Sequence, residues 1–324
     1  TTINGGNIKS ESDTTGNIAI FIEGNSTVIV NDGNISAITN APEGNPNGNS
    51  NRDTVVYWLT NGTLTVNGGN SKADGTSLNG NRMITRHNGR GTRGTVTIND
   101  GNFVATHPEI EGINNPTYPV SYVDFVNDVQ GPSTEIINGG TFNINSKRAV
   151  YGFATSNSSY GTLIVKGGEI NLTAPTAYGF TTGWGTNTMT GGKINITATT
   201  TGYGMTGRTT NNITGGEIIV NAGNGIGYGI NEGTNNITGG KIFGSTYGTY
   251  NSTNTIGTND EDINITNPEI IGGLYGIYGG TTSFYDGVLK GKTAANTDKT
   301  IVNKPRETKI FEEWDSQFKL RESD

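Results

Sequence analysis

The hexapeptide NNITGG occupies Asn211–Gly216 and returns unchanged at Asn235–Gly240, 24 residues further along the chain. A unit of this length cannot bury an apolar face by itself, whereas similar units stacked on one another share a continuous core. The interval therefore predicts a repeat protein in which equivalent residues of successive units lie in columns.

The same register extends over most of the chain when the second Gly of each Gly-Gly or Asp-Gly pair is taken as a reference mark. A Thr precedes the mark by six residues in every full repeat, and an apolar residue precedes it by three. A second apolar residue follows the mark by two, except at Ser71. The marks are Gly6, Gly33, Gly69, Gly101, Gly140, Gly168, Gly192, Gly216, Gly240 and Gly287.

The residues around each mark alternate with the period of a β-strand. In GGKINIT, Ile194 and Ile196 share one face and Asn195 takes the other. A further strand signal, Tyr-Gly followed by a short or apolar residue, recurs at Tyr151, Tyr178, Tyr203, Tyr228, Tyr247 and Tyr275. Each coil of about 24 residues thus has about three short strands separated by Gly and Asn turns. The predicted fold is all-β, a right-handed parallel β-helix (β-solenoid) over residues 1–295.

The opening Asn of the hexapeptide falls at an inward position. Five residues before the mark, the series is first apolar and then changes to Asn: Val28, Leu64, Val96, Leu163, Asn187, Asn211 and Asn235. A buried amide is costly unless it is hydrogen-bonded, and identical Asn residues on successive coils can bond one another. The sequence therefore predicts an internal Asn column, and the repeated phrase is architectural.

Composition excludes several classes of protein. Only 31% of the residues are hydrophobic and they lack a helical period, so a helical fold is not expected. The net charge of −7 argues against a nucleic-acid groove, and the absence of Cys removes disulfides and thiolate metal sites. No apolar run reaches the ~18 residues of a membrane span. We expect no cofactor and no metal, and interpret the acidic triplet Asp260–Asp262 as a solvated turn.

The stretch Ile256–Ala295, IGTNDEDINITNPEIIGGLYGIYGGTTSFYDGVLKGKTAA, resembles segments that recur in large surface proteins of Gram-positive and related bacteria. The shared order is Gly-Thr-Asn-Asp, a Pro-Glu-Ile strand, a Tyr-Gly-Ile strand and a Tyr-Asp-Gly turn. The resemblance implies an extracellular, cell-surface or wall-attached adhesin or stalk and supplies no catalytic residues. Because the chain begins at Thr1, we expect it to be part of a longer protein whose signal and anchor lie elsewhere.

Regular coils are predicted over residues 140–295 and irregular ones over 33–140, where the intervals between marks lengthen to 36, 32 and 39. The extra residues are assigned to three insertions on one side, spanning 41–53, 71–93 and 108–119. Insertions on one side of a solenoid commonly carry function. Aromatic rings, Arg and acids in and beside them predict a surface that binds a glycan or a host or microbial surface protein. The candidate ligand-binding residues are Tyr57, Trp58, Arg82, Arg86, His87, Arg90, Tyr118, Tyr122 and Asp124.

Other interpretations remain open. Trp58 and Phe125 could be core residues, with the Arg residues only solubilising a loop. A polysaccharide lyase or glycoside hydrolase would need a positioned acid or base. The candidates for that role match no known motif: Asp53, His87, His107, Glu109, Glu111, Asp124 and Asp128. The Thr column could bind ice, although no Thr-x-Thr pair persists. The Tyr series could stack on glycans, although one Tyr per coil is more typical of an internal or edge ladder.

The last segment, residues 296–324, differs from the rest. Its apolar residues Ile310, Phe311, Trp314 and Phe318 are spaced near a helical period. We expect a short cap over the last coil, or a linker to a further domain, that would close the open end of the stacked strands.

Overall fold

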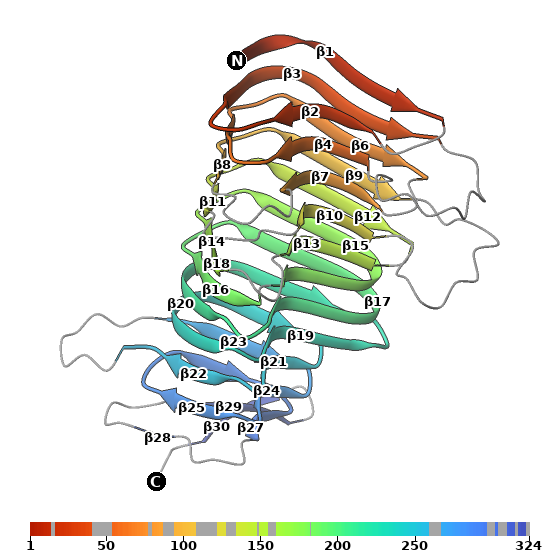
Figure 1. Ribbon diagram of the computed structural model, residues 1–324. Coiled ribbons are helices and arrows are strands. Elements are labelled where there is room, and N and C mark those ends of the chain that lie inside the picture. Colours follow the sequence, from red (N-terminus) through yellow and green to blue (C-terminus); the bar gives the residue numbers. More distant parts are fainter. Residues whose placement is uncertain are drawn as a thin grey trace.

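The computed structural model shows a solenoid-like stack of parallel strands (Figure 1). It describes residues 1–13, 17–40, 54–76, 80–86, 94–107, 122–127, 134–147, 149–154, 160–181, 183–258, 267–296, 302–303, 310–314 and 317–321. Within these residues there are 30 strands and no helix. The predicted all-β parallel architecture is therefore confirmed.

The strands stack as three ladders, each contributing about one short segment per coil. The first ladder begins with the opening residues of β1 (Thr2–Ser12) and β3 (Thr27–Thr39), and most of its strands start at the recurring Thr. It continues through β5 (Thr63–Val66), β8 (Thr95–Ile98), β11 (Thr134–Ile137), β14 (Tyr160–Val165), β16 (Trp184–Met189), the first parts of β18 (Thr210–Asn221) and β20 (Thr234–Gly244), then β22 (Thr253–Ile256), β25 (Thr281–Phe284) and β28 (Val302–Asn303).

The second ladder follows each Gly mark. It contains the later parts of β1 and β3, then β6 (Asn70–Gly75), β9 (Asn102–His107), β12 (Thr141–Ser146), the first parts of β15 (Glu169–Thr181) and β17 (Lys193–Thr206), the later parts of β18 and β20, β23 (Glu269–Gly272), β26 (Val288–Lys290) and β29 (Ile310–Trp314).

The third ladder carries the Tyr-Gly segments. It contains β2 (Ile18–Ile22), β4 (Thr54–Leu59), β7 (Asn81–Arg86), β10 (Tyr122–Asn127), β13 (Ala149–Ala154), the later parts of β15 and β17, β19 (Ile226–Asn231), β21 (Tyr247–Tyr250), β24 (Tyr275–Tyr278) and β27 (Thr293–Asn296). The chain passes from the second ladder to the third at one corner of the stack.

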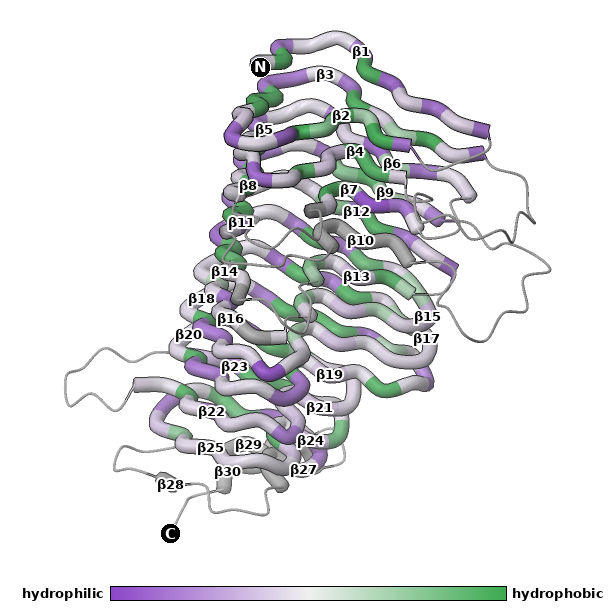
Figure 2. The backbone as a smooth tube through the Cα atoms, in the orientation of Figure 1, coloured by the Kyte–Doolittle hydropathy of each residue, from purple (hydrophilic) through white to green (hydrophobic). Residues whose placement is uncertain are grey.

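The core is built from the inward residues of all three ladders, which recur at matching places on successive strands (Figure 2). Ile194 and Ile196 are both buried, as the alternation predicts. Ser71, the exception in its series, is also buried, and its Oγ lies 2.8 Å from the Tyr57 hydroxyl. The large ring of Tyr57 thus reaches into the space that an apolar residue fills in other coils.

The predicted internal Asn column is confirmed. The side chains of Asn187, Asn211 and Asn235 are buried, and each amide donates to the next along the stack at 2.7–2.8 Å. Asn235 donates in turn to Asn254, and Asn254 to Thr282. The sequence analysis missed the last two members of this column.

Three details of the prediction are corrected. Residues 240–287 form two coils, because β22 and β23 supply an additional one. The proposed insertion 71–93 is not a single loop, since it contains strands β6 and β7, and Arg82 and Arg86 lie on β7. The helical spacing near the C-terminus is not realised either: β29 and β30 (Gln317–Arg321) form an antiparallel pair, and β29 also pairs with β26.

Candidate functional site

On the third ladder, the pairing of the strands places several predicted ligand-binding residues in one column with the repeated tyrosines. Val55 of β4 pairs with Arg82 of β7, and Arg82 pairs with Asp124 of β10. Asp124 pairs in turn with Tyr151, the first of the repeated tyrosines. Residues that the sequence assigned to separate features therefore belong to one continuous column.

From Tyr151 onward the column consists of tyrosines with stacked rings. Successive ring centroids are 4.6, 4.9, 5.0, 5.2 and 5.8 Å apart, and neighbouring planes are within 18° of parallel. The members are Tyr151, Tyr178, Tyr203, Tyr228, Tyr247 and Tyr275. All six side chains are half-buried, whereas the Gly after each Tyr is buried. The tyrosines therefore lie on the outer face, and we call this set the Tyr column.

Stacking at the strand spacing leaves part of each ring accessible. Carbon atoms in contact are ~3.5–4.0 Å apart, which is less than the centroid spacing observed here. Parallel rings at this spacing must therefore be offset like overlapping tiles, the arrangement that aromatic pairs prefer. Each tyrosine consequently presents a strip of ring and its edge on the outer face.

A second set of tyrosines widens the column at its C-terminal end. Tyr250 and Tyr278 stack on each other at 5.5 Å, with planes 4° apart. They meet the Tyr column obliquely, because Tyr250 lies 4.9 Å from Tyr247, and Tyr278 lies 4.9 Å from Tyr275. Leu274 is 41% exposed immediately before Tyr275.

Glycine is required behind the rings of Tyr151, Tyr178, Tyr203, Tyr228 and Tyr247. The inward position after the Tyr is crowded by the next coil and by a side chain from the second ladder. A Cβ on Gly204 would come closer than any real contact to the carbonyl oxygen of Gly229 and to Ile218. The Tyr-Gly signal thus has a packing cause, since the Gly lets adjacent coils approach while the Tyr faces outward.

The environment of the tyrosines shifts their acidity. Burial is the largest cause that raises the pKa of Tyr178, Tyr203, Tyr228 and Tyr247 above the ordinary value. Neighbouring tyrosines add to this effect at Tyr203, Tyr228 and Tyr247, because two adjacent phenolates would repel each other. The hydroxyls are therefore protonated, and able to donate hydrogen bonds, at neutral pH and somewhat above it.

The N-terminal end of the same face carries apolar and basic residues. Phe21 is 51% exposed, Ile18 is 37% exposed, and Phe21 pairs in register with Trp58. Trp58 and Arg82 are half-buried. We call Ile18, Phe21, Trp58 and Arg82 the N-terminal patch.

Tyr57 does not belong to this surface. Its side chain is 0% exposed, and burial raises its pKa to about 12, although the hydrogen bond with Ser71 opposes this shift. Its inclusion among the ligand-binding residues is corrected, because Val55, Val56 and Tyr57 are all buried and the strand does not alternate strictly here.

Three of the remaining ligand-binding candidates lie on strands of the third ladder. The backbone positions of Arg86, Tyr122 and Asp124 are described, on β7 and β10. His87, Arg90 and Tyr118 lie outside the described residues. The catalytic candidate His107 is buried at the end of β9. Outside the described residues lie the other acids considered for catalysis or for calcium: Asp53, Glu109, Glu111, Asp128 and Asp260–Asp262.

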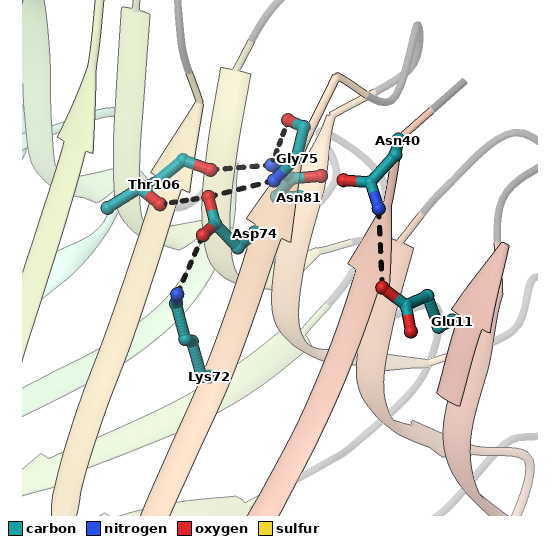
Figure 3. Close-up of polar contacts among 7 residues, drawn as sticks. All are labelled: Glu11, Asn40, Lys72, Asp74, Gly75, Asn81 and Thr106. Carbon is teal, nitrogen blue, oxygen red and sulfur yellow. Dashed lines mark hydrogen bonds and ion pairs between the residues drawn. The ribbon is translucent and has the colours of Figure 1, made fainter. Parts of the chain in front are cut away.

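A polar cluster holds the corner between the second and third ladders (Figure 3). The Asn81 amide donates to the backbone oxygens of Gly75 and Thr106, which belong to adjacent coils. Burial would raise the pKa of Asp74, but hydrogen bonds from Lys72, Thr106 and the backbone N–H of Gly75, with the Lys72 charge, lower it overall. These contacts fix the end of β6 and the end of β9, the strand that residues 108–121 follow in the chain.

The outer face of the first ladder displays the Thr column considered for ice binding. Thr63, Thr95 and Thr134 are half-buried and pair in register. The second outward position is mixed, however, because Ile and Asn residues in the intervening coils separate Thr65 and Thr97 from Thr188, and Thr188 from Thr255. The structure therefore offers no continuous Thr-x-Thr surface on the described strands.

Two charged features were not recognised in the sequence. Glu135 is buried in the inward column, between Val96 and Leu163 in register. On the second ladder, outward charges alternate in sign from coil to coil: Glu169, Lys193, Glu217, Lys241 and Glu269. The sequence signal for the first four members of this charge column was the residue directly after the marks Gly168, Gly192, Gly216 and Gly240.

The part of the chain that the structure describes contains no helix long and apolar enough to cross a membrane. Within the same residues, no group of three or more His, Asp or Glu is placed to hold a metal ion. Comparison with known proteins found no match among protein-family models, curated proteins or solved structures.

Proposed function

We propose that this chain is a non-catalytic, surface-displayed domain of a bacterial adhesin or stalk, built as a right-handed parallel β-helix, that binds a glycan through its N-terminal half. The sequence resemblance of residues 256–295 supports extracellular display. The continuous core and the columns of bonded side chains support a rigid rod that can hold a binding surface away from a cell.

The observation that carries the proposal is the N-terminal patch. Phe21 is the most exposed of the large apolar residues in the described chain, and it lies one coil from Trp58. Exposed aromatic rings stack on the apolar faces of sugars, and an Arg nearby can bond hydroxyls or an acidic group. A few aromatic and Arg anchors usually supply most of the energy of recognition.

The test is an array of glycans and extracellular-matrix proteins, probed with wild type and with a Phe21→Ser/Trp58→Ser variant. A matched control is Ile164→Ser, which removes a half-buried apolar residue from the outer face of the first ladder. We expect a glycan ligand whose binding falls at least tenfold in the double variant and is unchanged in the control, with unaltered circular dichroism.

Three outcomes contradict the proposal. A ligand that both variants bind as tightly as wild type would place recognition elsewhere. A protein ligand would replace the glycan assignment. Release of reducing ends from any polysaccharide on the array would show an enzyme, the alternative function considered from the sequence.

A further inference from the structure

The outer face that carries the Tyr column is free of charged residues within its strands. The third-ladder segments of β13, β15, β17, β19, β21, β24 and β27 contain no Asp, Glu, Lys or Arg. The outward charges carried by strands of the same coils lie instead on the second ladder, in the alternating Glu and Lys column, and the exposed Arg208 and Glu232 lie in the turns that follow β17 and β19. The Tyr column is thus a neutral strip of aromatic rings and hydroxyls, about 24 Å long for a strand spacing of ~4.8 Å.

We infer that the Tyr column is a second binding surface, which holds one neutral, extended polysaccharide chain with 1,4-β-linked sugars along the axis of the stack. This inference deepens the proposed function, on which it rests, by naming a substrate class and a site separate from the N-terminal patch.

The regular spacing of the rings favours a polymer. Adjacent rings are 4.6–5.8 Å apart, and each is presented in the same way by its coil. Each sugar of an extended 1,4-β-linked chain adds about the length of one pyranose ring. This length is close to the spacing between two successive rings of the Tyr column. An extended peptide advances only ~3.3 Å per residue and would lose register with the rings. A globular partner has no repeating surface to match.

The chemistry of the strip suits a sugar face. Ring strips and the exposed side chains of Ile226 (42%) and Leu274 (41%) can contact the apolar C–H faces of pyranose rings. The protonated hydroxyls of Tyr203 and Tyr228 can donate to sugar hydroxyls and accept from them. Repeated weak contacts of this kind add along one chain, since each further sugar binds at high effective concentration.

Charge favours a neutral chain over an acidic one. Glu232 lies close enough to Tyr203 to raise the pKa of its hydroxyl, so its carboxylate contributes negative potential at the edge of the strip. The chain as a whole also carries a net charge of −7. A polymer of uronic acids would therefore be repelled, and this repulsion would be strongest at low salt.

The test uses the full chain and soluble oligosaccharides of two to six sugars, measured by titration calorimetry. The probes are 1,4-β-linked glucose and 1,4-β-linked N-acetylglucosamine oligomers, with 1,4-α-linked glucose oligomers and oligogalacturonate for comparison. Affinity for at least one β-linked series should rise with length, by more than tenfold from two to six sugars, and should exceed that for the α-linked and acidic probes.

Substitutions in the Tyr column test whether the oligosaccharides bind there. Tyr203→Ser/Tyr228→Ser should lower the affinity for the six-sugar probe at least tenfold, and Tyr203→Phe/Tyr228→Phe should lower it less, because the rings remain. Tyr285→Ser is the matched control, since Tyr285 lies outside the Tyr column, in the turn between β25 and β26. Phe21→Ser/Trp58→Ser should leave this affinity unchanged, which separates the two surfaces.

The inference is overturned if no β-linked probe binds, if the acidic or α-linked probes bind as well, or if both Tyr203/Tyr228 double variants bind like wild type. It is also overturned if wild type self-associates in light scattering and the Tyr→Ser variant does not, because a second copy would then occupy the face. None of these results bears on a ligand of the N-terminal patch, so the failure of this inference is distinguishable from failure of the proposed function.

Discussion

The amide of Asn211 donates a 2.7 Å hydrogen bond to the side-chain oxygen of Asn235, one coil away in the interior of the solenoid. The Asn211 oxygen accepts from the Asn187 amide at 2.8 Å and from the Thr209 hydroxyl at 3.2 Å. One residue thus satisfies polar groups on three coils. Hydrogen bonds in such a chain strengthen one another at low dielectric, and an interruption is correspondingly costly.

Replacing Asn211 alone should therefore destabilise the protein more than its volume suggests. Asn211→Leu leaves the Asn187 amide without its acceptor and the Asn235 oxygen without its donor, which should cost ~2–4 kcal/mol. Replacing Asn187, Asn211 and Asn235 together by Leu, the residue found at 163 in the same column, should cost less. Urea denaturation followed by circular dichroism measures both; a single variant as stable as wild type would refute the role given to the column.

Alkaline pH should weaken the fold through Tyr57. Its pKa is raised to about 12 in the folded chain, above the usual value near 10 in an unfolded one. The folded state therefore retains a proton that the unfolded state loses. The stability associated with the protonated Tyr57 is complete below pH ~10 and is lost as the pH rises towards ~12. The loss from this residue is about 2–3 kcal/mol.

Tyr57→Phe isolates that contribution. The variant should start less stable, by ~1 kcal/mol or more, because the buried Ser71 hydroxyl loses its partner. Its urea midpoint should then fall less than that of wild type between pH 9 and pH 11. Equal slopes for the two proteins would mean that Tyr57 is not the group responsible.

The charge column should be sensitive to the order of its signs. Lys193 faces Glu217, with Nζ 3.5 Å from Oε2, and pairs in register with Glu169 on its other side. Lys193→Glu would set three carboxylates on consecutive coils and should cost about 0.5–1 kcal/mol, since the pairs are partly exposed. Lys166→Glu, at an exposed turn, makes the same change of net charge and should cost little. Added salt should reduce the difference between the two variants; a difference that persists in molar salt would point to packing.

The Tyr column should depend on the glycines behind it. Gly204→Ala forces a methyl group into the carbonyl oxygen of Gly229 and into Ile218, and should destabilise by ~1–3 kcal/mol or more. Gly223→Asn is the comparison, because Gly223 has φ of 54° with space around it, and Asn tolerates that conformation. Thermal melts of the two variants measure the difference, and a Gly204→Ala variant as stable as wild type would show that adjacent coils can separate.

The parts of the fold predicted from sequence are those in which every coil repeats the same residue. Thr at the start of the first ladder and an apolar residue, most often Ile, two positions after the mark recur because successive coils present the same packing environment. The coil from Thr253 was missed because no Gly-Gly mark follows Ile256; the chain instead reaches β23 through residues 257–268. A search for the Asn-x-Ile pattern alone would have found it, at Asn254 and Ile256.

The candidate site was less predictable, because inside and outside do not alternate strictly on the third ladder. Gly152 and Phe153 are both buried after the outward Tyr151, so a period of two fails within that strand. Tyr57 is inward for a different reason, since Ser71 leaves space that only a large ring with a hydroxyl fills. The register that aligns Arg82 with Tyr151 depends on pairing across two intervening connections, and no local pattern indicates it.

The C-terminal hairpin should protect the end of the stack. β29 pairs with β26 through Leu289 and Ile310, and β30 pairs with β29 in the opposite direction, so the parallel stacking of the second ladder ends there. An uncovered strand edge offers unpaired N–H and C=O groups to another chain. Deleting residues 308–324 should therefore cause association that increases with protein concentration, whereas deleting only 322–324, beyond β30, should not. Light scattering over a concentration series measures this association. A truncated chain that is monomeric and as soluble as the full one would show that the uncovered edge of β26 does not promote association.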